Sequence, residues 1–263
     1  MPRRQAIHGA PNVLKKRFGQ HFLTDRSILR RIVEFAKIRP EDTVLEIGPG
    51  AGALTTQLAA SAHRVIAIEI DRDLIAALRA RMPSTVDIIE GDALTAGFPS
   101  GRFHLVGNLP YNVATPLFKR FIENRERIID VTVMIQKEVA ERLIAKPGTG
   151  EYGPLSVLIQ YYATVTYGFT VPPGAFKPRP KVDSAVIRLD WKPSVPAARG
   201  FTDFVHHAFS SRRKKLANNL LHLFPALRRE EILQRLATAG IGASARPEEL
   251  SVEEFLHVYN QFR

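Results

Sequence analysis

Thr43-Val44-Leu45-Glu46-Ile47-Gly48-Pro49-Gly50-Ala51-Gly52 is the stretch that decides the fold of this chain. Its first five residues are largely apolar and β-prone, which predicts a buried strand over residues 43–47. Glycines follow at once, and residues 53–62 then carry apolar side chains at helical spacing. Because glycine lets a backbone turn tightly and approach a ligand closely, this strand, loop and helix are typical of a nucleotide-type binding site.

The segments that surround this unit continue the alternation of strand and helix. We predict further strands over residues 64–70, 86–90, 103–106, 131–135 and 184–189, and helices over residues 27–38, 74–82, 116–123, 138–145 and 155–163. Such alternation indicates βαβ units around a parallel sheet. The predicted fold class is therefore α/β, with a Rossmann-like domain.

The pattern changes after Lys192-Pro193-Ser194-Val195-Pro196, because only helical periodicity follows it. We predict helices over residues 201–223, 230–239 and 252–262. A proline-containing linker between two such regions marks a domain boundary. We therefore divide the chain into a Rossmann-like domain over residues 1–191, which includes a basic N-terminal arm, and a small all-helical C-terminal domain over residues 192–263.

The composition narrows the class of protein. Lysine and arginine number 37 against 26 aspartates and glutamates, a net charge of +11, which favours a polyanionic partner such as nucleic acid. Many basic proteins are nevertheless simply soluble. A hydrophobic fraction of 45% excludes a disordered chain, and the absence of cysteine excludes disulfides, thiolate zinc sites and a cysteine nucleophile. Lacking both a membrane-length apolar run and a signal-peptide pattern, the sequence predicts a cytoplasmic protein.

The positive charges are unevenly placed, and three blocks stand out. They comprise Arg3, Arg4, Lys15, Lys16 and Arg17 near the N-terminus, then Lys177, Arg179 and Lys181, and finally Arg212, Arg213, Lys214 and Lys215. The last block is our candidate RNA-binding surface, since clustered cations contact phosphates. A solvated helical face would give the same pattern.

The glycine loop alone leaves its ligand open. Residues 48–53 also satisfy a relaxed dinucleotide fingerprint of the form G-x-G-x-x-A. Glu46 helps to choose, because a carboxylate would repel a pyrophosphate but tolerates a ligand with a sulfonium and an ammonium group. This favours S-adenosylmethionine over NAD.

Two further acidic residues follow the next strands. Glu69 ends the predicted strand 64–70, where a carboxylate can accept hydrogen bonds from ribose hydroxyls. Asp92, in Gly91-Asp92-Ala93, could accept from the adenine amine of the cofactor. Glu69 could instead be a solvated carboxylate at a strand end, and Asp92 could simply cap the following helix.

Asn108-Leu109-Pro110-Tyr111 follows the strand 103–106, at the carboxyl edge of the predicted sheet. The side-chain oxygen of Asn108 and the main-chain carbonyl of Leu109 could each accept one N–H of an adenine amine, so that its lone pair points at a methyl group. Pro110 stiffens this arrangement, and Tyr111 can stack on a base taken out of a helix.

Such a reaction needs little beyond positioning, because the sulfonium charge is neutralised as the amine gains charge and the proton leaves afterwards. In isolation, Asn-Pro-Tyr-like sequences are more often simple turns. The position of this tetrapeptide downstream of the glycine loop favours a catalytic site.

The sequence resembles a known family, the ribosomal RNA adenine dimethyltransferases. The resemblance rests on five motifs in order, residues 19–23 (GQHFL), 46–50 (EIGPG), 91–93 (GDA), 108–112 (NLPYN) and 176–184 (FKPRPKVDS). It runs from about Phe18 into the C-terminal helices. It implies a class I S-adenosylmethionine-dependent methyltransferase that uses no metal. The unbroken residues 108–112 and a basic helix over residues 209–220 look more like the small-subunit enzymes than the antibiotic-resistance branch.

The resemblance also implies a substrate and a set of roles. The substrate would be two adjacent adenines in the 3′-terminal hairpin of small-subunit (16S) ribosomal RNA, converted to N6,N6-dimethyladenosine within an assembling 30S particle by a monomeric enzyme. His21 and Leu23 would close over the cofactor, and Gly48 and Gly50 would approach its methionine portion. Glu69 would bind the ribose of the cofactor, and Asp92 and Ala93 would bind its adenine. Asn108 would contact both the cofactor and the target amine. Phe176 would be a second aromatic side chain beside the target adenine. His21 departs from the asparagine often found at its position.

Three alternatives remain open from the sequence. The nearest is a resistance enzyme that modifies one adenine of large-subunit RNA by the same chemistry. A non-catalytic RNA-binding protein that kept the fold would not need Asn108 and Tyr111. A dehydrogenase would bind NAD and leave the tetrapeptide unexplained.

Overall fold

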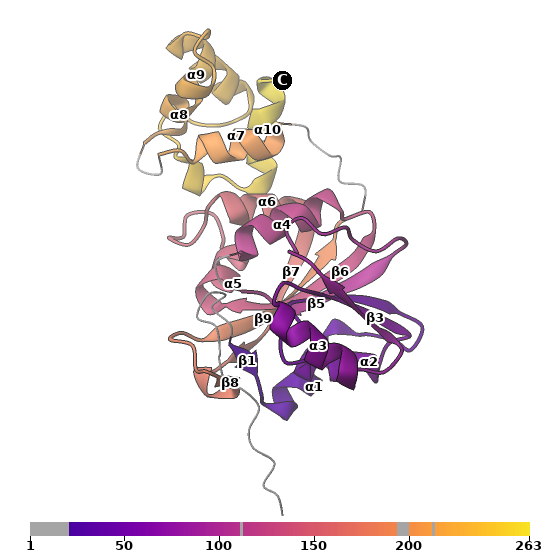
Figure 1. Cartoon of the computed structure of the whole chain (residues 1–263). Coiled ribbons are helices and arrows are strands. Elements are labelled where there is room, and N and C mark those ends of the chain that lie inside the picture. Colours follow the sequence, from indigo (N-terminus) through magenta and orange to yellow (C-terminus); the bar gives the residue numbers. More distant parts are fainter. Residues whose placement is uncertain (1–20, 111–112, 194–199, 212–213) are drawn as a thin grey trace, which may run out of the picture.

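A mixed seven-stranded sheet forms the centre of the computed structural model, which describes residues 21–110, 113–193, 200–211 and 214–263 (Figure 1). The strands of this sheet are β2 (Thr43–Ile47), β3 (Arg64–Glu69), β4 (Val86–Glu90), β5 (Phe103–Asn108), β6 (Ile128–Gln136), β7 (Ala163–Val171) and β9 (Ser184–Trp191). Their order is β4-β3-β2-β5-β6-β9-β7, parallel from β4 to β6, with β9 antiparallel to both of its neighbours. The predicted α/β, Rossmann-like architecture is confirmed.

Helices cover both faces of this sheet. The first six are α1 (Arg26–Ala36), α2 (Ala53–Ala59), α3 (Arg72–Arg81), α4 (Ala114–Glu123), α5 (Lys137–Ile144) and α6 (Pro154–Tyr162). Strand side chains alternate between two cores: Val44 packs with α1 and α2, whereas Leu45 and Ile47 pack with α4, α5 and α6. The near-continuous apolar strands seen in the sequence are those of a sheet buried on both sides.

The chain changes direction across the sheet between β2 and β5. From β2 it runs outward through β3 to β4, and it then returns to place β5 on the other side of β2. Loops that leave neighbouring carboxyl ends in opposite directions open a crevice at such a switch point. The glycine loop after β2 and the tetrapeptide at the end of β5 both lie at this point.

Three strands were missing from the sequence prediction. β7 was not predicted, since Gly168 interrupts its alternation; there the pairing with β9 shifts register, and an added Cβ would lie 3.0 Å from the Val186 carbonyl oxygen. The short strands β1 (Phe22–Leu23) and β8 (Phe176–Lys177) pair antiparallel with each other in a separate two-stranded sheet. Two-residue strands have no periodicity to detect, so only the tertiary structure brings these segments together.

The described part of the C-terminal region contains helices and no strand: α7 (Phe201–Ala208), α8 (Leu216–Leu223), α9 (Arg229–Thr238), the short 3₁₀ helix Pro247–Glu249 and α10 (Val252–Gln261). The prediction of one helix over residues 201–223, and of a basic helix over 209–220, was wrong. Residues 210–215 offer no apolar side chain to bury, and Asn219 instead donates to the carbonyls of Ala208 and Ser211 at 2.6 and 3.1 Å. None of the described helices is long and apolar enough to cross a membrane.

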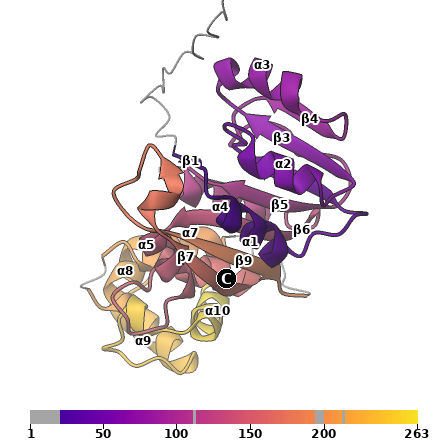
Figure 2. The ribbon, with the colours of Figure 1, turned by 90° about the horizontal axis from the view of Figure 1, so that it is seen from below.

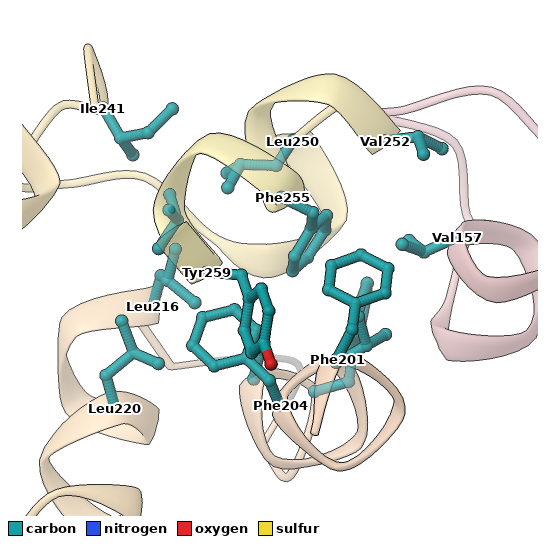
Figure 3. Close-up of a cluster of buried hydrophobic side chains, with 14 of the residues drawn as sticks. Val157, Phe201, Phe204, Leu216, Leu220, Ile241, Leu250, Val252, Phe255 and Tyr259 are labelled. Carbon is teal, nitrogen blue, oxygen red and sulfur yellow. The ribbon is translucent and has the colours of Figure 1, made fainter. Parts of the chain in front are cut away.

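The C-terminal helices share one apolar core with α6. Phe201 and Phe204 of α7 and Phe255 and Tyr259 of α10 meet there, with Val157 of α6 facing them (Figure 3). Figure 2 shows α7 to α10 gathered on the side of the molecule away from β4 and α3. The division at residues 191 and 192 stays a prediction, and this contact would fix the C-terminal helices against the Rossmann-like part.

A buried cluster of charged residues lies near the amino ends of the parallel strands, at the end of the sheet opposite the switch point. Nδ1 of His104 lies 2.8 Å from Asp130 Oδ2, its Nε2 lies 3.3 Å from Asp42, and Arg188 donates to Asp130 at 2.8 Å and to the Ala36 carbonyl at 2.6 Å. Burial alone would lower the pKa of His104, but the hydrogen bond and charge of Asp130, together with Asp42, outweigh it and raise the pKa. Protonated His104 therefore ties β5 to β6 and to the start of β2.

We expect this cluster to make stability depend on pH. Because the pKa of His104 is raised in the folded state, its contribution is complete below the ordinary value of 6.5 and is lost as pH rises through the folded value. The difference in free energy of unfolding between the wild type and His104→Gln should therefore be larger at pH 6 than at pH 9, measured by urea denaturation. His257→Gln, at an exposed position on α10, controls for the loss of a histidine. A His104→Gln difference that does not change with pH would contradict the role.

Candidate functional site

A cavity of about 210 Å³ occupies the switch point between β2 and β5. All the residues that the sequence predicted for cofactor binding line it, together with Leu109 and Pro110: His21, Leu23, Gly48, Gly50, Glu69, Asp92, Ala93 and Asn108. They come from β1, the loop after β2, the end of β3, the loop after β4, and the end of β5. The structure thus brings together residues that lie far apart in the chain, such as His21 and Asn108 at 87 positions.

The glycine loop forms one wall of the cavity. Gly48 and Gly50 have φ angles of +68° and +57°, a region that other residues rarely adopt. A Cβ on Gly50 would also lie 2.9 Å from the ring of Phe22. A side chain at Gly50 would therefore strain the turn and displace Phe22, which itself lines the cavity.

Glu69 holds that loop in place. Its Oε2 accepts a hydrogen bond from the Gly50 amide at 3.0 Å, and its Oε1 accepts from the amides of Ile70 and Asp71, each at 2.9 Å. Glu69 is buried, with only 3% of the residue exposed. With three bonds accepted, its oxygens retain lone-pair capacity toward the cavity, as the predicted ribose contact requires.

Glu46 is a buried acid in the same wall, 1% exposed, and its Oε2 accepts no hydrogen bond from the described residues. Burial raises its pKa to about 8, and the charge of Glu69 adds to this effect. The hydroxyl of Thr55 is near enough to oppose the shift, but it makes no hydrogen bond of good geometry. A cation in the cavity would stabilise the ionised form of Glu46.

Asn108 is the last residue of β5, which runs two residues further than predicted. Its Nδ2 donates to the His21 carbonyl at 3.1 Å, which leaves Oδ1 as the acceptor of the amide. The Leu109 amide donates to the Met134 carbonyl of β6 at 3.0 Å, which fixes the peptide on the sheet. Two acceptors, Asn108 Oδ1 and the Leu109 carbonyl, are thereby held in the same short segment. Tyr111 lies outside the described residues.

Phe176, the predicted second aromatic, is 1% exposed and packs in the core with α1. It pairs with Leu23 across the β1–β8 ribbon, and the ring of His21 donates through Nδ1 to the Pro178 carbonyl at 2.9 Å. Phe176 does not line the cavity as described. Its contact with a target base stays a prediction.

Sequence reasoning did not identify two residues that line the cavity, Phe22 and Ile70, or Arg120, which contacts a loop of the cavity. Phe22 covers the glycine loop, and Ile70, an apolar side chain that is 45% exposed, lines the cavity beside Glu69. Arg120 on α4 donates to the carbonyls of Ala93 and Ala96. The position of Ile70, directly after the acid that ends β3, is a weak sequence signal for a role at the cavity. The contacts of Phe22 and Arg120 join segments that are distant in the sequence, so no local pattern indicates them.

The predicted RNA-binding block is only partly described. Lys214 and Lys215 are exposed immediately before α8, and Arg212 and Arg213 lie outside the described residues. The block Lys177, Arg179 and Lys181 is also exposed, on and after β8.

The sheet order, the glycine loop and the acids at successive strand ends define a Rossmann-like, class I S-adenosylmethionine-dependent methyltransferase fold. The chain belongs to the ribosomal RNA adenine dimethylase family, whose model matches residues 12–263. The dinucleotide-binding dehydrogenase is thereby set aside.

Curated relatives cover nearly the whole chain. A protein of Chlorobium phaeobacteroides is 42% identical over 256 residues, 95% of this chain and 94% of its own length. One of Shouchella clausii is 44% identical over 258 residues, 92% of this chain and 87% of its own. Both are named ribosomal RNA small subunit methyltransferase A.

Solved structures agree on the fold. A dimethyladenosine transferase from Plasmodium falciparum superposes with a TM-score of 0.81 at 28% identity, over 92% of this chain and 97% of that one. The 23S rRNA methyltransferase ErmE superposes with a TM-score of 0.71 at 31% identity, over 91% of this chain and 98% of that one.

We expect Glu46 to lower the stability of the ligand-free protein. An unfolded glutamate ionises near pH 4.5, whereas folded Glu46 keeps its proton up to about pH 8, so ionisation increasingly favours the unfolded state between these values. Glu46→Gln should therefore be the more stable protein by on the order of 1 to 3 kcal/mol at pH 8, and by less at pH 5. Thermal unfolding across this range, with Glu41→Gln at an exposed position as control, measures the effect. A gain in stability of Glu46→Gln that does not grow with pH would contradict the proposed effect of Glu46.

Proposed function

We propose that this chain transfers methyl groups from S-adenosylmethionine to the N6 atoms of two adjacent adenosines in the 3′-terminal hairpin of small-subunit (16S) ribosomal RNA, giving N6,N6-dimethyladenosine. The observation that carries the proposal is the cavity in which the glycine loop and its acids meet the paired acceptors of Asn108 and Leu109. The names of the small-subunit relatives, which are 42% and 44% identical over more than nine tenths of this chain, support the choice of RNA.

The charges of the cavity suit S-adenosylmethionine. Glu46 and Glu69 both line it, and Glu46 carries a buried oxygen without a partner among the described residues. Anionic pyrophosphate would be repelled there, whereas a ligand with a sulfonium and an ammonium group supplies the missing positive charge.

The nucleoside part of the cofactor would lie toward β3 and β4. Glu69 would accept from the ribose hydroxyls, and Asp92 from the adenine amine. The amide of Ala93 makes no hydrogen bond to the described residues and could donate to adenine N1. Ile70 offers an exposed apolar surface on which a flat base can lie.

The target amine would lie at Asn108 and Leu109. When bound, the cofactor supplies an electrophilic methyl group on sulfur. Asn108 Oδ1 and the Leu109 carbonyl would each accept one N–H, which holds the nitrogen lone pair toward that methyl group. Asn108 and Leu109 would hold the amine while its lone pair takes up the methyl group, and one amine proton would then pass to water. Tyr111 and Phe176 would stack on the base from opposite sides.

The substrate would be small-subunit RNA within an assembling 30S particle, recognised by a cytoplasmic, monomeric enzyme. Methyl transfer from labelled cofactor to small subunits that lack the modification, followed by mapping of the methylated positions, tests this proposal. We expect label on two adjacent adenines near the 3′ end. Label confined to large-subunit RNA would show the resistance activity instead.

Removal of the Asn108 amide should abolish most of the transfer. In Asn108→Ala we expect kcat to fall by about a hundredfold or more, as for the loss of a group that acts mainly in the transition state. RNA affinity should change little. Asn260→Ala, exposed on α10, is the matched control. Unaltered methyl transfer by Asn108→Ala would remove the proposed mechanism.

Charge reversal before α8 should weaken RNA binding. In Lys214→Glu/Lys215→Glu we expect lower affinity and a shallower dependence on salt, because fewer counterions are released from phosphates. Filter binding across a salt series measures both. Arg26→Glu/Arg30→Glu, exposed on α1 at the other end of the molecule (Figure 1), controls for net charge. An unchanged slope in the lysine variant would leave the block as a solvated surface.

A further inference from the structure

The chain between β4 and β5 carries Asp92 and Ala93 but forms no helix or strand. The Gly91 amide donates to the Glu69 carbonyl at 2.9 Å and fixes the start of this segment to β3. After Gly91 the hydrogen bonds are local: Asp92 Oδ1 accepts from the Leu94 amide at 2.8 Å, and the Asp92 carbonyl accepts from the amides of Thr95 and Ala96 at 2.9 and 2.7 Å. These local bonds shape a turn, but they do not fix Ala93 to Ala96 relative to the cavity. The adenine side of the site therefore needs support from another element.

Arg120 provides that support from α4. Its Nη1 donates to the Ala93 carbonyl and its Nη2 to the Ala96 carbonyl, while its guanidinium carbon lies 4.1 Å from the centroid of the Phe98 ring. The group is flat and has five N–H donors, so it can serve two carbonyls and an aromatic face at once. A lysine ammonium, as a point charge on a flexible stem, cannot reproduce this geometry.

The same face of α4 also forms part of the cavity. Val113, Leu117 and Arg120 follow one another at the spacing of successive helical turns, and Val113 and Leu117 line the cavity. The Val113 amide donates to the Pro110 carbonyl at 3.2 Å, directly after the tetrapeptide. One helix thus connects the acceptors for the target amine with the loop for the cofactor's adenine.

We propose that Arg120 is a positioning residue that makes the site selective for the adenine base of its cofactor, by holding the Ala93 and Ala96 carbonyls so that Asp92 and the Ala93 amide face adenine N6 and N1. This inference rests on the proposed function. Adenine offers a donor at N6 and an acceptor at N1, and hypoxanthine reverses both. A loop held in one place rejects the second base, because two polar groups of the site would then face like groups.

A second arginine offers a matched control. Arg127 donates to the carbonyls of Phe98 and Pro99, further along the same loop. Its removal loosens the loop without releasing Ala93 or Ala96. Loss of base selectivity in Arg120 variants alone therefore distinguishes positioning from general destabilisation.

The experiment is calorimetry of S-adenosylhomocysteine and S-inosylhomocysteine on the wild type, Arg120→Ala, Arg120→Lys and Arg127→Ala. We expect the wild type to prefer the adenosyl ligand by about a hundredfold or more. In Arg120→Ala the affinity for S-adenosylhomocysteine should fall about tenfold and the affinity for S-inosylhomocysteine less than about twofold. The affinities of Arg120→Lys should lie between those of the wild type and Arg120→Ala. Arg127→Ala should bind both ligands like the wild type. KM for S-adenosylmethionine should rise in Arg120→Ala while kcat at saturation stays within about twofold.

The proposal is overturned if Arg120→Ala keeps the wild-type preference, if Arg127→Ala loses as much of it, or if the wild type has none. Thermal unfolding checks each variant, and Arg120→Lys alone decides the question if Arg120→Ala does not fold. Methyl transfer to small subunits by the wild type is measured separately, so that failure of the proposed function is seen independently of ligand preference.

Discussion

The hydrogen bond from the Gly50 amide to the Glu69 carboxylate is the contact on which the cavity depends. It joins the loop after β2 to the end of β3, two strands whose parallel pairing already sets their ends side by side. The left-handed glycines let the loop bend toward this acceptor, and the amides of Ile70 and Asp71 hold the carboxylate from its other oxygen. One acid thereby orders the turn while keeping lone-pair capacity for a ligand.

Ionisation of Glu46 in the empty cavity destabilises the folded state. Glu46 is buried beside Glu69 and has an oxygen without a partner among the described residues, which is unfavourable in the absence of a cation. At the amino ends of the strands, Asp130 also has a buried oxygen, Oδ1, without a partner among the described residues, but its Oδ2 is paired with both Arg188 and His104. Glu46 has no ion pair among the described residues, so a cationic ligand in the cavity would supply the charge that its carboxylate lacks.

Segments from both ends of the Rossmann-like part meet over the cavity. The β1–β8 ribbon places Leu23 against Phe176, and the His21 carbonyl accepts from Asn108, which orients the amide oxygen of that residue. From the other side, α4 connects the tetrapeptide to the loop that carries Asp92. The groups proposed to hold the cofactor and the target amine are therefore supported by overlapping sets of contacts.

The sequence by itself determined the α/β class, the glycine loop and the strand-end positions of Glu46, Glu69 and Asn108, because periodicity and local turn chemistry are properties of short segments. Only the tertiary structure decided the β1–β8 ribbon, the break between α7 and α8, the burial of Phe176 and the clamp of Arg120 on Ala93 and Ala96. Each of these depends on contacts between residues far apart in the chain, or on whether a polar run such as residues 210–215 finds anything to pack against. Local propensity cannot predict such contacts, since they form only when the sheet has brought the segments together.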